Sequence, residues 1–251
     1  MNPLVQSSIA RLEQLLPLGE RRARMPAPLG AMHRRIVEAL VWHGLPPSRT
    51  ELEKAAGALD VDDALQALSA ADLVVLGPPR DEGGSRSVVG AYPVTTQRTP
   101  HALRVRARCE APWVWAMCAI DALAVAPVFE TEVQVDSRCR ISGMPVRVRQ
   151  QGERVVEVQP ATLCVGVRWQ APIGHAAHSL CMEMVFLLDA DAARQWHAGA
   201  LDRHDVYSVD EAMRFGAGFF RPLLAGPWCS SAPGATGRGA QEPRSRLHNP
   251  M

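Results

Sequence analysis

The chain has 251 residues, of which 47% are hydrophobic, enough to bury the core of one large domain or two small ones. Its 27 Lys and Arg residues nearly cancel its 26 Asp and Glu residues, so net charge gives no reason to expect nucleic acid as a partner. No window approaches the roughly 18 consecutive apolar residues of a membrane span. Residues 1–18 are amphipathic and lack the pattern of a signal peptide. We therefore expect a cytoplasmic protein without a membrane partner.

The N-terminal part predicts three helices followed by a β-hairpin. The expected helices cover 31–44, 48–57 and 60–71, and the expected strands cover 73–76 and 88–92. Ser48 and Glu51 form a capping-box signature at the start of the second helix. This order is typical of a winged helix-turn-helix. The third helix, however, carries Asp62, Asp63 and Asp72 and no basic residue, so we do not expect it to bind DNA.

The second region, from about 99 to 226, mixes helices and strands. Alternation over 103–107 predicts a half-buried strand, and Pro112 and Pro127 bound a predicted helix over Trp113–Ala126. Further strands are expected at 131–136, 146–149, 155–158, 163–169 and 179–188, and helices at 190–197 and 209–224. The predicted class is α+β with a mostly antiparallel sheet. The predicted units are an N-terminal helix or extension (1–30), a winged-helix-like domain (31–98), a core (99–226) and a disordered tail (227–251).

The cysteines and one carboxylate are the candidates for chemistry. Without a secretory signal, the six cysteines are better interpreted as reduced thiols than as a disulfide framework. On the predicted Trp113–Ala126 helix, Cys118 and Asp121 share one face, where a soft thiolate and a proton carrier could act on one molecule. A buried carboxylate tends to be protonated near neutrality, as a proton donor must be. The plainer interpretation is a surface Asp beside a buried Cys.

A second thiol would complete a soft-metal chelate, and Cys181 is the candidate. On the predicted 179–188 strand it faces away from the apolar stripe, so it meets the Cys118 helix or faces solvent. Two rival metal sets stay open. One is His175 and His178 with Cys181, and the other is a four-cysteine zinc site, which no Cys-x-x-Cys knuckle supports. Its ligands would be Cys118, Cys139, Cys164 and Cys181. For Cys109, Cys164 and Cys229 the plainer interpretation is a small buried hydrophobic residue.

Several short motifs occur in a distinctive order. They are Pro47-Ser48-Arg49-Thr50, Cys118-Ala119-Ile120-Asp121-Ala122-Leu123, Cys139 followed by Ser142-Gly143-Met144-Pro145-Val146, Val158-Gln159-Pro160, Ser179-Leu180-Cys181, Trp196, and Ser208-Val209-Asp210-Glu211-Ala212 with Phe219 and Leu223-Leu224. In this order, from about Pro46 to Leu224, the chain resembles the organomercurial lyase (alkylmercury lyase) family. It departs from the family pattern at Trp115-Ala116-Met117, where the family has Ala-Trp directly before the cysteine, and at Ala122, where the family has Thr.

The resemblance implies a winged-helix-like unit packed on an α+β catalytic core. It also implies protonolysis of a carbon–mercury bond to a hydrocarbon and Hg(II), a mercury-detoxifying activity. Cys118 would take the mercury, Cys181 would be the second thiol, Asp121 would carry the proton, and Cys139 would be structural. No organic cofactor is expected. Hg(II) would stay bound as product until low-molecular-weight thiols or a mercuric reductase remove it. The alternative is a non-catalytic metal-binding or metal-responsive DNA-binding protein, which would have no use for a proton carrier.

Overall fold

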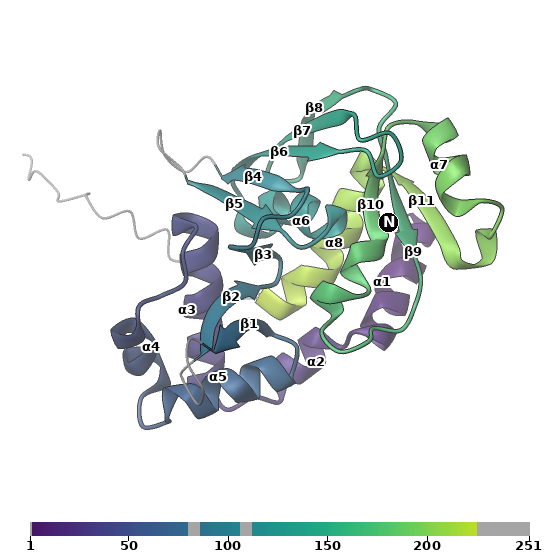
Figure 1. The fold of residues 1–251 in the computed structure, drawn as a ribbon. Helices are drawn as coiled ribbons and strands as arrows, with labels where there is room; N and C mark the ends of the chain where they lie inside the picture. The colour runs from purple at the N-terminus through teal and green to yellow at the C-terminus, as the bar shows by residue number, and fades with distance from the viewer. Residues whose placement is uncertain (1, 80–85, 106–111, 225–251) are drawn as a thin grey trace, which may run out of the picture.

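The computed structural model describes residues 2–79, 86–105 and 112–224 (Figure 1). Its α-helices are α1 (Pro3–Leu15), α2 (Leu18–Ala23), α3 (Ala27–His43), α4 (Arg49–Ala56), α5 (Val61–Ala70), α6 (Ala119–Phe129), α7 (Ala190–His197) and α8 (Val209–Leu224). Its strands are β1 (Val74–Pro79), β2 (Arg86–Ala91), β3 (Val94–Thr95), β4 (Ala102–Val105), β5 (Trp113–Ala116), β6 (Glu132–Arg138), β7 (Pro145–Gln151), β8 (Arg154–Gln159), β9 (Cys164–Arg168), β10 (Met184–Leu187) and β11 (His204–Ser208). Three short 3₁₀ helices complete it: η1 (Ala176–His178), η2 (Cys181–Glu183) and η3 (Leu201–Arg203).

Two antiparallel sheets organise the fold, as the α+β prediction requires. The larger has the order β1-β2-β3-β5-β4-β6-β7-β8, and the smaller has the order β10-β9-β11. The predicted N-terminal hairpin, β1 and β2, joins the core strands in one sheet because β3 pairs with both β2 and β5. Helix α8 packs against α6, and α1 packs against α8 (Figure 1). Because one sheet contains strands of both predicted domains, the domain boundaries stay predictions. The predicted elements on either side of them are present.

Helix α6 is the central element of the core, and all eleven of its residues are buried. A helix that is apolar around its whole circumference must be enclosed by other elements. Pro127 lies inside it, so the carbonyl of Leu123 loses the N–H that would normally bond to it. The buried side chain of Gln150, from β7, donates to that carbonyl at 3.0 Å. The sheet thus satisfies the polar group that Pro127 leaves open.

The N-terminal helices follow their sequence signals closely. The capping box at Ser48 and Glu51 is present, and Asp60 caps α5. Helix α3 begins at Ala27, four residues before the predicted start, with Pro28 in its first turn. Helix α1 is fixed to α8 and β11: Asn2 Nδ2 donates to Glu211 Oε1 at 2.6 Å, and the Ser8 and Tyr207 hydroxyls lie 2.6 Å apart.

The predicted helix over Trp113–Ala126 is wrong in its first part. Trp113–Ala116 forms strand β5, between β3 and β4, and the helix starts only at Ala119. The side chains of Val114 and Ala116 are buried and those of the two tryptophans are more exposed, which is the period of a strand. Pro112 therefore precedes a strand, and Cys118 caps the helix.

The predicted strand over 179–188 is also wrong in its first part. Only Met184–Leu187 is a strand, and Cys181 lies in η2. Local bonds from the Met182 and Glu183 N–H groups to the Ser179 and Leu180 carbonyls hold this turn. The alternation argument for the direction of Cys181 therefore does not apply, since a 3₁₀ turn has no two-residue period.

Some expectations lie outside the described residues: Cys109, Cys229, the end of the predicted strand near 107, the hairpin loop and the predicted tail. Among the residues that are described, no helix is long and apolar enough to cross a membrane.

Gly216 of α8 sets the distance between α8 and α6. A Cβ at this position would lie 2.8 Å from the Ile120 carbonyl oxygen, which is backbone and cannot move aside. We expect Gly216→Ala to lower the free energy of unfolding by about 1–3 kcal/mol in urea denaturation, despite its better helix propensity. Gly19→Ala in α2, with nothing within 4 Å of the new Cβ, should be neutral or slightly stabilising. Equal effects of the two substitutions would contradict this account.

Candidate active site

Cys118, Asp121 and Cys181 come together in one buried cluster. Their Sγ and carboxylate oxygen atoms all lie within 4.8 Å of one another. The three side chains are buried, with relative exposures of 0%, 2% and 4%. Cys118 and Asp121 come from the start of α6, and Cys181 comes from η2, more than sixty residues later in the sequence. The plainer interpretation, an Asp on the protein surface, is therefore wrong.

Cys118 holds its place as the N-cap of α6. The Asp121 N–H donates to Cys118 Sγ at 3.3 Å, as it would to a capping serine oxygen. The Cys118 thiol in turn contacts Met184 Sδ at 3.7 Å. The helix N-terminus favours negative charge on this sulfur. The cap thereby fixes Asp121 three residues further on, in the first turn of the same helix.

Asp121 is a carboxylic acid poised to exchange a proton near neutral pH. Burial raises its pKa to about 7, although contacts with Cys118 and Cys181 act in the opposite direction. Its Oδ2 atom has no hydrogen-bond partner among the described residues. An unpaired buried carboxylate oxygen is costly, and protonation lowers that cost.

Both thiols are protonated in the resting cluster. Burial raises the pKa of Cys118 well above its ordinary value, and the contact with Cys181 and the Asp121 charge raise it further. The contact with Cys118 lowers the pKa of Cys181, but burial and the Asp121 charge outweigh it, and the pKa is raised. The buried Tyr92 hydroxyl interacts with Cys181 and partly offsets this rise. With Asp121 protonated, the cluster thus avoids a net buried charge.

Neither rival metal set is assembled in the described part of the chain, where the only group of three or more possible ligands is this cluster. His175 bonds to Asp72 and Ser69 instead of approaching Cys181. Cys139 Sγ accepts the Leu188 N–H at 3.3 Å, and the half-buried Cys164 thiol bonds to the Leu187 carbonyl at 3.6 Å. These two cysteines thus serve the packing around β10.

The sequence that carries this cluster matches the model of a known protein family. The model for alkylmercury lyase matches residues 94–221, just over half of the chain, and this range contains all three residues of the cluster. The chain belongs to the alkylmercury lyase family.

Individual alkylmercury lyases agree over a similar range. The chain is 28% identical over 160 residues to the alkylmercury lyase of Bacillus cereus, covering 62% of this chain and 65% of that protein. It is 29% identical over 160 residues to that of Staphylococcus epidermidis, covering 62% and 66%. The chain thus spans about 65% of the length of the relatives it matches.

The fold agrees with a solved structure, the crystal structure of the mercury-bound form of MerB2. The two structures superpose with a TM-score of 0.65 at 17% sequence identity, over 83% of this chain and 98% of that one.

A cavity of about 430 Å³ leads to the cluster. Cys181 lines it, together with the buried sulfur-containing side chains of Met117 and Met184. Met117 is one of the departures from the family pattern, and its Cε fills the space beside Gly90, where a Cβ would lie only 2.8 Å away. Cys118 is not among the lining residues. A molecule entering this cavity therefore meets Cys181 before Cys118.

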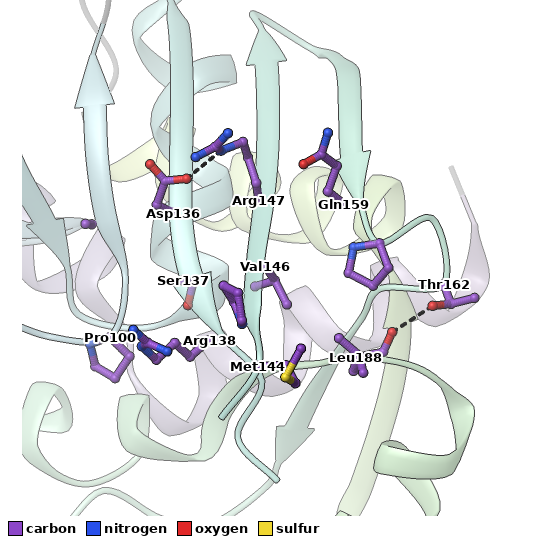
Figure 2. Close-up of a pocket in the computed structure, with 13 residues that line it drawn as sticks. Pro100, Asp136, Ser137, Arg138, Met144, Val146, Arg147, Gln159, Thr162 and Leu188 are labelled. Carbon is purple, nitrogen blue, oxygen red and sulfur yellow. Dashed lines mark hydrogen bonds and ion pairs between the residues drawn. The ribbon is translucent and has the colours of Figure 1, made fainter. Parts of the chain in front are cut away.

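A wider groove of about 830 Å³ lies beside the cavity (Figure 2). Arg138 and Pro100 belong to the lining of both. Within the groove, Arg147 Nε donates to Asp136 Oδ1 at 2.6 Å. The groove contains none of the clustered residues and opens on the outer face of β6 and β7.

The turn that carries Cys181 is tied to the N-terminal helices. Asp72, directly after α5, accepts from His175 Nδ1 at 2.7 Å and from the Ala176 N–H at 3.0 Å. The Ser69 hydroxyl lies 3.2 Å from His175 Nε2. Sequence reasoning assigned no role to Asp72 or Tyr92 at the site, because partners this distant leave no periodic signal. Met184, which contacts the Cys118 thiol, lies only three residues after Cys181 and could have been identified from that proximity.

The raised pKa of Asp121 makes a prediction for stability. The folded-state pKa of Asp121, about 7, exceeds the ordinary 3.8. The contribution of Asp121 to the free energy of unfolding is therefore greatest below pH 4 and is lost as pH rises to 7. Three pH units correspond to roughly 4 kcal/mol. We expect Asp121→Asn to gain about that much over the wild type between pH 4 and 7 in urea denaturation, with no further gain above. Asp210→Asn, an equal charge change at an exposed site, should show no such trend. A pH-independent difference for Asp121→Asn would contradict the assignment.

Asp72 gives a second prediction. Asp72→Asn keeps the size of the side chain and suits the backbone φ of 60° but removes one of the two acceptors. We expect faster amide hydrogen exchange in residues 176–183, by about tenfold, which corresponds to the roughly 1.4 kcal/mol of a charged hydrogen bond. Asp62→Asn, on α5 but away from this turn, is the control. Unchanged amide hydrogen exchange in residues 176–183 of the Asp72→Asn variant would contradict the role of Asp72 in holding this turn.

Proposed function

We propose that the chain is an organomercurial lyase that cleaves the carbon–mercury bond of alkyl- and arylmercury compounds by protonolysis. The observation that carries the proposal is the burial of two thiols and one carboxyl group within 4.8 Å of one another, beside a cavity that Cys181 lines. Mercury is a soft metal and prefers thiolates to oxygen ligands. A metal-binding protein without activity would not need a carboxyl group with a pKa of about 7 in the same cluster.

In the proposed reaction, R–Hg–X and two cysteine thiols give R–H, HX and mercury bound to two cysteine sulfurs. Cys181 replaces X on mercury, and its proton leaves with X. Cys118 then binds mercury through its sulfur as a second thiolate, and its proton passes to Asp121 as Asp121 gives up its own. The added sulfur makes the mercury-bound carbon more basic. The protonated Asp121 delivers its own proton to that carbon as the carbon–mercury bond breaks, and the proton taken from Cys118 leaves Asp121 protonated for another cycle.

The order of capture follows from access. Because Cys181 lines the cavity and Cys118 does not, mercury reaches Cys181 first, in contrast to the order that the family resemblance implies. Hg(II) stays between the two sulfurs until low-molecular-weight thiols or a mercuric reductase remove it. The reaction needs no organic cofactor. It does need reduced thiols, and Cys118 and Cys181 are both free, which suits our prediction of a cytoplasmic protein.

The helices α3–α5 with the hairpin β1–β2 have the order of a winged-helix unit, and we propose a structural role for them. Asp62, on the surface of α5, pairs with Arg49 at 2.9 Å, and the adjacent Asp63 is exposed. These carboxylates would repel phosphates, so nucleic acid is not a proposed partner. The Asp72 contacts instead join this unit to the turn that carries Cys181.

The test is hydrocarbon release from phenylmercury or methylmercury salts with excess thiol, followed by gas chromatography of benzene or methane. Cys118→Ser and Cys181→Ser should abolish release, because oxygen is a poor ligand for mercury. Asp121→Asn should bind mercury but lower the release rate by about 10²–10⁴-fold.

Cys164→Ser is the matched control, since this half-buried thiol bonds to backbone and lies outside the cluster. Its release rate should match the wild type. Hydrocarbon release at the wild-type rate from either Cys118→Ser or Cys181→Ser would remove the site assignment.

A further inference from the structure

The cavity that leads to Cys181 has two chemically different ends. Its buried lining is mostly apolar or sulfur-containing, at Val75, Met117, Met184, Val185 and Phe186, with Thr95 and His101 as buried polar residues. Its exposed lining carries the side chains of Arg98, Arg138, Arg140 and His178, which we call the rim. A ligand that fills this cavity would therefore place an apolar group inward and a polar group outward.

The charge of the rim is one-sided. No Asp or Glu is present among the residues that line the cavity. Within the described residues, no carboxylate forms an ion pair with Arg98 or Arg140, and Arg138 donates only to the Gly143 carbonyl, at 3.1 Å. The adjacent groove differs, because its Arg147 is paired with Asp136 (Figure 2). The rim thus presents cations whose pairing capacity is unused.

The positive charge lies at the opening of the cavity and not in its buried part. His101, which also lines the cavity, is buried, and burial lowers its pKa to about 4, with a further contribution from the Arg140 guanidinium. His101 is therefore neutral at pH 7, and its Nδ1 bonds to Ser137 at 2.9 Å. The cationic groups at the cavity opening are the arginines themselves. An anion at the rim would be attracted, and a cation would be repelled.

Mercury bound to two ligands is linear, so its organic group and its thiol carrier point in opposite directions. Before Cys181 replaces the carrier, with the organic group against the apolar lining and the mercury beside Cys181, the carrier thiol lies toward the rim. We propose that Arg98, Arg138 and Arg140 bind the carboxylates of the thiol that carries the organomercury ion into the cavity. The preferred substrate is thus an organomercury adduct of an anionic thiol. This inference rests on the proposed function and specifies its substrate class.

The test is single-turnover hydrocarbon release with enzyme in excess, so that product removal by thiols does not affect the rate. Preformed one-to-one phenylmercury adducts of mercaptosuccinate, 2-mercaptoethanol and cysteamine supply an anionic, a neutral and a cationic carrier. A fourth arm, 4-carboxyphenylmercury with 2-mercaptoethanol, places the carboxylate on the organic group instead. The half-saturating enzyme concentration is measured for each adduct.

We expect the mercaptosuccinate adduct to saturate at the lowest enzyme concentration and the cysteamine adduct at the highest. Arg98→Gln and Arg140→Gln should each raise the half-saturating concentration for the mercaptosuccinate adduct about three- to tenfold and leave the 2-mercaptoethanol adduct unchanged. The preference should vanish between about 0.01 M and about 1 M salt, as the Debye length falls from about 30 Å to about 3 Å. Arg154→Gln, an equal charge change at an exposed residue of β8, is the control.

Three outcomes would overturn the inference. One is equal saturation by the three phenylmercury adducts, another is an equal effect of Arg154→Gln, and the third is a rim effect confined to the 4-carboxyphenylmercury arm. In each case hydrocarbon is still released, so the lyase function stands. If the wild type releases hydrocarbon from none of the four adducts, the proposed function itself fails.

Discussion

The constraint on which the site depends is the exclusion of water from one carboxyl group and two thiols. In water, Asp121 would ionise at low pH and the thiols would be hydrated. Enclosed at the start of α6, the carboxyl group has a pKa of about 7 and the pKa values of both thiols are raised. The apolar, completely buried α6 produces this environment, and α8 packs so closely on its first turn that a Cβ at Gly216 would lie 2.8 Å from the Ile120 carbonyl oxygen. The packing of the core and the environment of the site thus depend on the same helix, α6.

The cluster has two halves with different supports. Cys118 and Asp121 are fixed by the cap and the first turn of a buried helix, so their relative placement is determined locally. Cys181 lies on a 3₁₀ turn without such support, and its position depends on β10 on one side and on the Asp72 contacts on the other. A site that must admit a ligand benefits from this division. The Asp121 carboxyl group keeps its geometry, while the Cys181 thiol on the cavity wall lies on a segment held by a few hydrogen bonds.

The sequence predicted most elements and the members of the cluster, for different reasons. Helices α7 and α8 were predicted at their observed bounds because their apolar spacing and first-turn carboxylates agree. Residues Trp113–Ala116 were misassigned because Pro112 resembles a helix start and the following apolar run fits either structure, and only pairing with β3 and β4 decides. The cysteines and Asp121 were identified through motif order, thiol chemistry and the helical spacing of Cys118 and Asp121, whereas the strand alternation used for Cys181 does not apply. Contacts such as that between Asp72 and His175 join residues more than a hundred positions apart and could not be predicted.

Charge neutrality links this environment to the proposed chemistry. In the resting cluster both thiols are protonated, and below its pKa of about 7 Asp121 is protonated too, so the site then carries no net charge. After carbon–mercury cleavage, Hg(II) with two thiolates and a protonated Asp121 is again neutral overall. Binding the organomercury ion to one thiolate also gives a neutral species, since one positive charge replaces one proton. With Asp121 protonated, the buried site therefore holds no net charge before or after cleavage, and so avoids a cost of several kcal/mol. The arginines that attract an anionic carrier lie outside this neutral zone, at the exposed end of the cavity, where solvent reduces the cost of their own charge.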